Sequence, residues 1–186
     1  MLRRLGEVDI RKPDVGSHRE IVGEGEDTLT GVSLVHNLFV ATYLKDAQTR
    51  VRIYSKDGAL VREVELPGIG TASGFGGRPS DTETFYTFTS VAVPTSVYRY
   101  DMVTGESELL RASDADVDPD AYETLQVFIT SNDGTRVPMF ITSRKDIERD
   151  GDNPTLLYGY GGFNISMTPG FSISRIGWME MGGVPA

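Results

Sequence analysis

The chain contains no cysteine, and it has no dense run of lysine and arginine. A disulfide framework, a thiolate zinc site and a cysteine nucleophile are therefore excluded. Its 186 residues include 27 acidic and 18 basic side chains, which give a net charge of -9. This balance argues against binding to a nucleic-acid backbone or to an anionic membrane surface. We expect neither nucleic acid nor membrane among its partners.

Long apolar runs are missing as well. No segment approaches the roughly 18 apolar residues of a membrane span. The two arginines near the N-terminus are not followed by an apolar run of signal-peptide length. We therefore expect a soluble protein in the cytoplasm, and the missing cysteines agree with this expectation.

The motifs of common catalytic and cofactor sites are also absent. There is no Gly-x-Ser-x-Gly pentapeptide, and the only histidines, His18 and His36, have no Ser and Asp constellation beside them. The glycine-rich residues 68–74 do not match a dinucleotide fingerprint, because the third glycine comes one residue late and no helix pattern follows. We interpret this run as a flexible loop, and we expect neither a cofactor nor a metal.

Strand patterns that recur with a period of about 45 residues dominate the first two thirds of the chain. Each unit has a buried strand, an alternating strand, a tight acidic and glycine-containing turn and a last strand, which is the layout of a β-propeller blade. The expected strands lie at residues 38–44, 50–54 and 60–66 in the first unit and at 84–89, 96–100 and 106–110 in the second. Two units and a partial one before residue 38 are too few to close a propeller ring.

The composition changes after residue 110. Residues 112–120 are acidic and contain a proline, as domain junctions often do, so we place a boundary near residue 115. Beyond it the pattern predicts a hairpin with an Asn-Asp-Gly turn, a third strand and a short helix. These elements are expected at residues 124–129 and 137–142, 154–158 and 171–179. The predicted domains are residues 1–115 and 116–186.

Residues 156–164, LLYGYGGFN, carry the candidate chemistry. An apolar run that breaks into glycines and aromatics is typical of a buried strand that brings backbone and a tyrosine hydroxyl into the active site of an α/β enzyme. Tyr160 would donate its hydroxyl to a developing oxyanion, and Phe163 would offer a flat apolar face to a small ring. From these residues alone, aromatics that simply pack around a tight glycine turn are an equally good interpretation.

Residues 156–166, LLYGYGGFNIS, together with Thr168 and Pro169, closely resemble the prolyl oligopeptidases, which are serine peptidases with an α/β-hydrolase fold. The resemblance extends to residues 131–141, 81–90 and 40–46 and covers essentially the whole chain. It implies a mostly β segment of such an enzyme: the last blades of a seven-bladed propeller in residues 1–115, then the first strands of the hydrolase domain in residues 116–186.

The resemblance also implies an activity, cleavage of short proline-containing peptides on the carboxyl side of proline. Tyr160 matches the position of the family's side-chain oxyanion donor, and Phe163 matches a residue that lines the pocket for the proline ring. The serine, aspartate and histidine of the family are expected downstream of residue 186, so this polypeptide alone is expected to be inactive. The full-length protein is expected to be a monomer.

Two other interpretations stay open. A non-catalytic propeller interaction module would have a reading frame that stops near residue 186, whereas a peptidase frame would continue into a Gly-x-Ser-x-Gly elbow. Another member of the same peptidase clan would share the fold, although Phe163 and its neighbouring residues favour the proline-specific branch. One departure from the family pattern is Pro185, which interrupts the apolar strand expected after Gly182 and Gly183.

Overall fold

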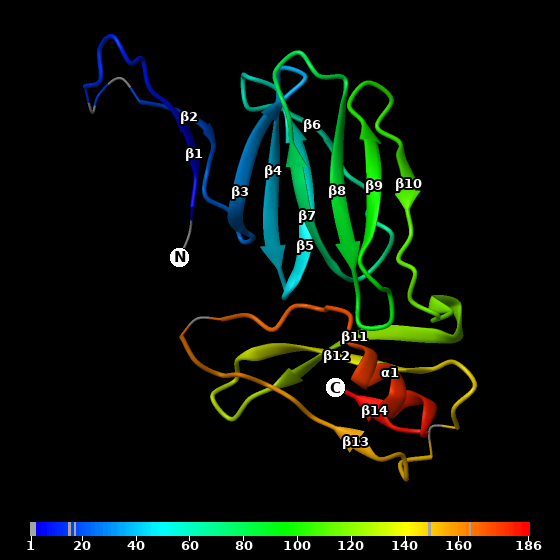
Figure 1. The fold of residues 1–186 in the computed structure, drawn as a ribbon. Coiled ribbons are helices and arrows are strands. Elements are labelled where there is room, and N and C mark those ends of the chain that lie inside the picture. The colour runs from blue at the N-terminus through cyan, green and yellow to red at the C-terminus, as the bar shows by residue number, and fades with distance from the viewer. Residues whose placement is uncertain (1–2, 15, 17, 149, 164) are drawn as a thin grey trace.

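The structure is a computed structural model that describes residues 3–14, 16, 18–148, 150–163 and 165–186. It is mostly β structure, as the sequence predicts. Two four-stranded antiparallel sheets form the upper part in Figure 1, and a hairpin, one helix and a short parallel strand pair lie below them. A two-stranded arm, β1 (Leu5–Glu7) with β2 (Arg19–Val22), precedes the first sheet.

The first sheet is a meander of four consecutive strands. It consists of β3 (Thr28–Val35), β4 (Leu38–Lys45), β5 (Gln48–Tyr54) and β6 (Leu60–Glu63). Lys45 pairs with Gln48, and the two residues between them, Asp46 and Ala47, both have positive φ angles, of 47° and 61°. Two-residue loops of this kind twist in the same sense as the strands and fix the register of the hairpin.

The second sheet repeats this plan. It consists of β7 (Thr71–Gly76), β8 (Glu83–Thr89), β9 (Ser96–Asp101) and β10 (Ser107–Arg111). From Leu38 at the start of β4 to Glu83 at the start of β8 the offset is 45 residues, as the sequence repeat predicts.

One prediction for this region was wrong. The glycine-rich stretch, interpreted as a flexible loop, enters β7 at Thr71 and pairs with β8. Gly74, with φ of +119°, lies at a register shift in this pairing, and a Cβ there would lie 2.7 Å from the carbonyl oxygen of Phe85. Glycine is needed because the two backbones approach so closely, not because the segment is loose.

The two sheets stack face to face and share one hydrophobic core. Val40, Val51 and Ile53 of the first sheet pack with Tyr86 and other aromatic residues of the second. Tyr86 stacks on the ring of Phe75 at 4.5 Å and on that of Tyr98 at 5.1 Å. Each such side chain contributes about 1.5–3 kcal/mol when fully buried. The alternation of the strands thus places one face of each sheet in a common core, as neighbouring propeller blades do.

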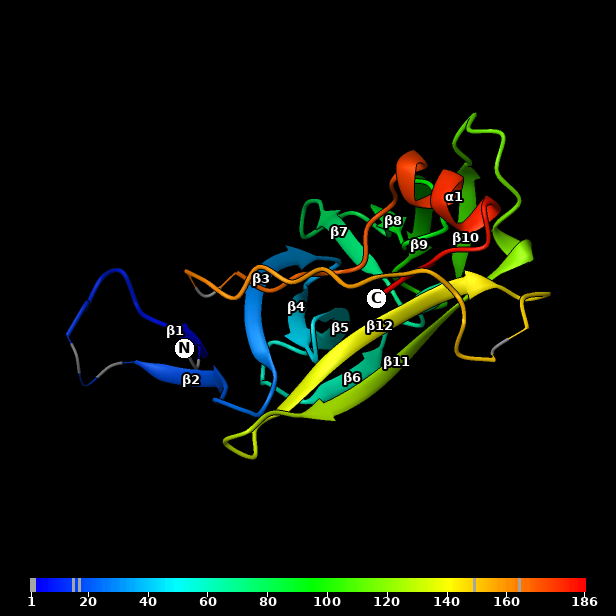
Figure 2. The same ribbon diagram turned by 90° about the horizontal axis from the view of Figure 1, so that it is seen from below.

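The C-terminal part begins after a connecting segment with a short 3-10 turn, Pro119–Ala121. The hairpin of β11 (Tyr122–Thr130) and β12 (Arg136–Arg144) follows and crosses beneath both sheets (Figure 2). The predicted turn is present, with Gly134 at φ of +85°. Then come β13 (Thr155–Leu156), α1 (Ile173–Glu180) and β14 (Val184–Pro185).

The strands β13 and β14 are parallel, so β13, α1 and β14 form one crossover unit. Pro185 does not interrupt this pairing, contrary to the sequence-based expectation. Val184 N donates to Pro154 O and Ala186 N donates to Leu156 O, both at 2.9 Å, so the ladder needs no donor at residue 185. The predicted boundary near residue 115 stays a prediction. In the described ranges, no helix combines the length and the apolar character needed to cross a membrane.

Candidate functional site

The candidate residues lie on one long segment, residues 157–172, which joins β13 to α1 and which we call the glycine loop. Its first anchor is the hydrogen bond from Tyr158 N to Ala186 O at 3.0 Å. The buried strand predicted here is not observed. Strand β13 has only two residues, and both Leu156 and Leu157 are exposed. The reason is that β13 pairs on one side only, with β14, and no second layer covers the apolar run.

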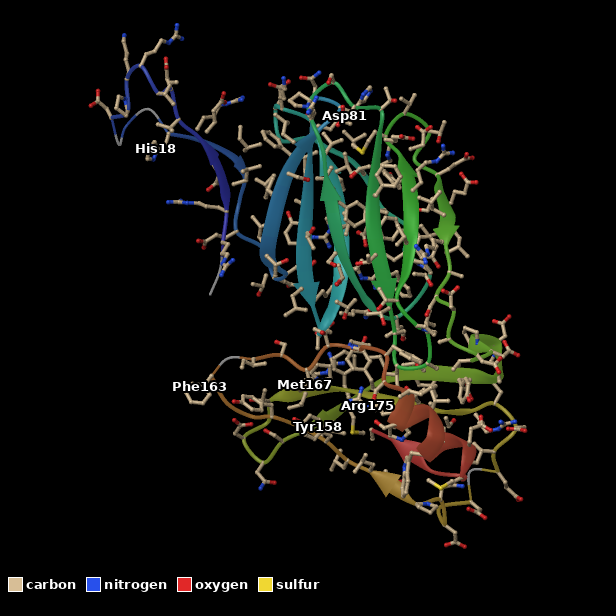
Figure 3. All side chains as sticks on the ribbon, viewed as in Figure 1. His18, Asp81, Tyr158, Phe163, Met167 and Arg175 are labelled. Carbon is tan, nitrogen blue, oxygen red and sulfur yellow. The ribbon has the colours of Figure 1, made fainter. Side chains whose placement is uncertain are left out.

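Tyr160 and Phe163 both project from the glycine loop into solvent. Tyr160 is 48% exposed. Phe163 is 91% exposed and lies at the far tip of the loop in Figure 3. Within the described part of the chain, the Tyr160 hydroxyl has no hydrogen-bond partner. A phenol that is free in this way can donate to a ligand.

The backbone around Phe163 is strained. Gly161 has φ of +65°, and Phe163 itself has φ of +51°, a conformation that costs a bulky residue about 1–3 kcal/mol. Ile165 N donates to Gly162 O at 3.0 Å and closes a local turn around it. Positive φ angles also occur at other non-glycine residues of this chain, such as Asp46 and Phe75, but Phe163 combines the strain with a side chain that is almost fully exposed. Residues held in such conformations cluster at ligand-binding sites, so Phe163 is a candidate contact for a ligand.

The far end of the glycine loop is buried again at Pro169 and is attached to the second sheet. Thr71 Oγ1 donates to Pro169 O at 2.7 Å, and Phe171 N donates to Thr89 Oγ1 at 3.1 Å. Sequence reasoning missed both threonines. They are polar residues at strand ends, and nothing in the local pattern indicates a contact with residues 98 and 82 positions away.

A cavity of about 340 Å³ lies beside the loop, between the hairpin and α1. Tyr158, Met167 and Arg175 line it, and Figure 3 shows their positions. The Arg175 guanidinium donates to Gly170 O at 3.2 Å. Tyr160 and Phe163 do not line this cavity, so the predicted site is the exposed side of the loop and not the hollow beneath it.

An ionic cluster fixes α1 against the hairpin. The Tyr122 hydroxyl and the Arg144 guanidinium both donate to the carboxylate of Glu180. Burial, together with the bond to Glu180, raises the pKa of Tyr122 to about 12. The same two donors hold the pKa of Glu180 below its ordinary value. The cluster thus holds the helix that follows the glycine loop.

The two histidines form no catalytic site among the described residues. His18 lies on the N-terminal arm, remote from Phe163 in Figure 3, and His36 lies in the turn between β3 and β4. Neither stands in a serine and aspartate constellation in the described ranges. No cluster of three or more potential metal ligands is found in the part of the chain that the structure describes.

Comparison with known proteins gives the family. Residues 1–113 match the family model described as prolyl oligopeptidase, N-terminal beta-propeller domain. The chain belongs to the prolyl oligopeptidase family. It is 41% identical over 184 residues to a prolyl endopeptidase of Elizabethkingia meningoseptica, covering 99% of this chain and 26% of the relative. A prolyl endopeptidase of Elizabethkingia miricola is 40% identical over 183 residues, 98% of this chain and 26% of that protein.

Solved structures of prolyl oligopeptidases have the same fold. A structure from a study of two prolyl endopeptidases and their inter-domain dynamics matches with a TM-score of 0.88 and 45% identity, covering 98% of this chain and 27% of that one. Prolyl oligopeptidase B from Galerina marginata, bound to a 25mer macrocyclization substrate, matches with a TM-score of 0.84 and 30% identity, over 98% of this chain and 26% of that one. The chain thus spans about a quarter of the length of its relatives.

Proposed function

We propose that the chain is a segment of a serine-type prolyl endopeptidase that cleaves short peptides on the carboxyl side of proline. Relatives that carry the name prolyl endopeptidase are 41% and 40% identical over nearly the whole chain, which supports this proposal. The Galerina marginata relative was solved with bound peptide substrates, which supports peptides as partners. The monomeric state, the cytoplasmic location and the absence of nucleic-acid and membrane partners stay predictions.

In this proposal, residues 1–115 are the last blades of the propeller and residues 116–186 open the α/β-hydrolase peptidase domain. The stacked four-stranded meanders support the first part. The parallel β13 and β14, joined through α1, support the second, because parallel strands with a helical crossover are the basic unit of α/β domains. A non-catalytic propeller module would not need this unit.

The observation that carries the proposal is the presentation of Tyr160 and Phe163 on a strained, exposed loop. We assign the Tyr160 hydroxyl as the side-chain donor to the oxyanion that forms when a serine attacks the scissile carbonyl. Phe163 would form an apolar wall for the proline ring. The serine, histidine and aspartate, and the backbone N–H that completes the oxyanion hole, would come from a part of the protein outside these 186 residues.

The test is the substitution Tyr160→Phe in the full-length enzyme, assayed with a Gly-Pro reporter peptide. Loss of one oxyanion donor costs about 3 kcal/mol of transition-state stabilisation, so kcat should fall roughly 100-fold while KM changes little. An unchanged kcat would remove the role assigned to Tyr160.

The neighbouring tyrosine provides a matched control. Tyr158 belongs to the same sequence motif but faces the cavity beside the loop, so Tyr158→Phe should leave kcat within about two-fold of the wild type. Phe163→Ala should instead raise KM for the proline reporter roughly ten-fold or more, because apolar pocket contacts contribute about 1–3 kcal/mol. Equal kinetics of the Phe163→Ala variant and the wild type would contradict the proline-pocket role.

A further inference from the structure

The glycine loop is attached at its two ends to two different parts of the molecule. Its near end is held in the C-terminal part, where Tyr158 N donates to Ala186 O. Its far end continues into α1, where Arg175 donates to Gly170 O at 3.2 Å. The propeller holds the same end, through Thr71 Oγ1 to Pro169 O at 2.7 Å and Phe171 N to Thr89 Oγ1 at 3.1 Å. The propeller therefore contacts the loop that carries the candidate site directly.

Thr71 and Thr89 contact the glycine loop together, as one pair. They are directly opposite each other in the antiparallel pairing of β7 with β8, so both hydroxyls come from the same end of one blade. The Thr89 hydroxyl also donates to Val93 O at 3.0 Å. Its only proton is thereby committed, which leaves a lone pair oriented for Phe171 N. The pair thus offers one donor and one acceptor to adjacent backbone groups of the loop.

Between its anchors the glycine loop has little support of its own. The described residues from 159 to 168 are exposed apart from the half-buried Gly162, and the backbone hydrogen bond among them joins Ile165 N to Gly162 O. Pro169 is the first buried residue after this stretch. Tyr160 and Phe163 lie between the two anchored ends of the glycine loop, so their positions depend on both anchors.

We infer that Thr71 and Thr89 of the propeller are positioning residues for Tyr160 and Phe163, and that the propeller thereby orders the active-site loop. The inference rests on the proposed function of the two aromatic residues. Without the two threonine contacts the far end of the glycine loop is held through α1 alone, and a loop held more loosely samples more conformations. A hydroxyl that must meet an oxyanion within a few tenths of an ångström then acts in a smaller fraction of encounters. The hydrogen bonds from the blade restrict the loop and thereby raise the fraction of encounters in which the Tyr160 hydroxyl is correctly placed.

Thr71→Val in the full-length enzyme tests the inference. Valine keeps the shape of threonine but cannot donate to Pro169 O, so kcat for the Gly-Pro reporter should fall about 3- to 10-fold, the effect of losing one neutral hydrogen bond. Thr71→Ser keeps the hydroxyl and should restore most of the rate. The melting temperature should stay close to that of the wild type, because the contact is local.

Thr87→Val is the matched control on the same blade. Thr87 also bonds through its hydroxyl, with Ser73 Oγ at 2.9 Å, and it lies two residues from Thr89 on the same side of the sheet, but it makes no hydrogen bond to the described residues of the glycine loop. Its removal should leave kcat unchanged. Equal losses in Thr71→Val and Thr87→Val would overturn the positioning role in favour of general weakening of the blade.

A double-variant cycle separates positioning from other effects. In a Tyr160→Phe background, Thr71→Val should lower kcat by less than two-fold, because the hydroxyl through which its positioning acts on kcat is already gone. A full 3- to 10-fold loss in that background would overturn the inference while leaving the role of Tyr160 intact. If Tyr160→Phe itself has no effect, the role proposed for Tyr160 fails instead.

Hydrogen exchange tests the anchor without any assay of activity. In the wild-type protein the Phe171 amide should be protected by Thr89 Oγ1, and in Thr71→Val it should exchange about ten-fold faster, because the two contacts are adjacent in the chain. An unchanged exchange rate would overturn the claim that Thr71 holds this end of the loop, whatever the kinetics show.

Discussion

Gly183 lies against the indole of Trp178, in the turn that leads from α1 into β14. A Cβ at this position would lie 2.3 Å from Trp178 Nε1, closer than any real contact. That nitrogen is buried and has no hydrogen-bond partner among the described residues. The close approach therefore depends on the missing side chain of glycine and not on its conformational freedom.

We predict that Gly183→Ala destabilises the protein by about 1–3 kcal/mol, the usual cost of overpacking a closely packed site. Gly177, in the exposed part of α1, is the matched control, since a Cβ there meets nothing within 4 Å. Gly177→Ala should stabilise by about 0.5–1 kcal/mol, because alanine is the better helix former. Urea unfolding followed by circular dichroism would measure both changes, and a loss of stability in Gly177→Ala would contradict the argument.

The candidate site shows what single residues can and cannot predict. Tyr160 and Phe163 stand out in the sequence because glycines and aromatics alternate around them, and the structure places both on the exposed side of one loop. Their catalytic and binding roles stay predictions. Thr71 and Thr89 could not be found, because a hydroxyl at a strand end becomes informative only when the fold brings a distant carbonyl or amide to it.

At the scale of secondary structure, α1 depends on a cluster of charged and hydroxyl groups. Its Glu180 accepts from Tyr122 of β11 and from Arg144 of β12, and Arg144 also pairs with Asp146. The donors hold the pKa of Glu180 below its ordinary value of 4.5. A carboxyl whose pKa is lower in the folded state stabilises that state above the unfolded pKa and loses this contribution as the pH falls.

We therefore predict that α1 loosens from the hairpin as the pH falls from about 5 to about 3. Trp178 is the only tryptophan of the chain and lies on α1, so its fluorescence should report the change. In Glu180→Gln the carboxylate is absent, and most of the acid-dependent change in fluorescence should disappear. An identical pH profile in the variant and the wild type would show that the cluster does not hold the helix.

A strand could be predicted from the sequence where its own residues and the adjoining turn indicate it. The hairpin of β11 and β12, the buried strand β4 and the alternating strand β5 follow from apolar patterns and turn residues, and β8 and β9 follow from the repeat of that unit. Strand β7 was missed because its glycines break the alternation, and it forms by pairing with β8. The length and burial of β13 were overestimated, because its apolar residues suggest a buried strand. Burial depends on neighbouring elements, which the residues of the strand itself do not reveal.

At the scale of the whole molecule, the two sheets share a packed core but the glycine loop leaves apolar side chains uncovered. Leu157 is 71% exposed and Phe163 is 91% exposed, and the hairpin beside them adds further exposed apolar residues. Single exposed apolar residues are normal, but a contiguous group marks a surface that another part of a protein covers. In a chain that spans about a quarter of its relatives, the rest of the peptidase domain is the cover that we propose.

The purified 186-residue chain should therefore self-associate and should not cleave a Gly-Pro reporter. Size-exclusion chromatography should show species larger than a monomer, and the double substitution Leu157→Ser and Phe163→Ser should shift them toward the monomer, because it removes apolar area from the uncovered loop. Ile10→Ser is the matched control, since Ile10 is 87% exposed but lies on the N-terminal arm. An equal shift in Ile10→Ser would contradict the claim that the glycine loop causes the self-association. Measurable cleavage by the chain alone would contradict the proposal that the serine, histidine and aspartate lie outside these 186 residues.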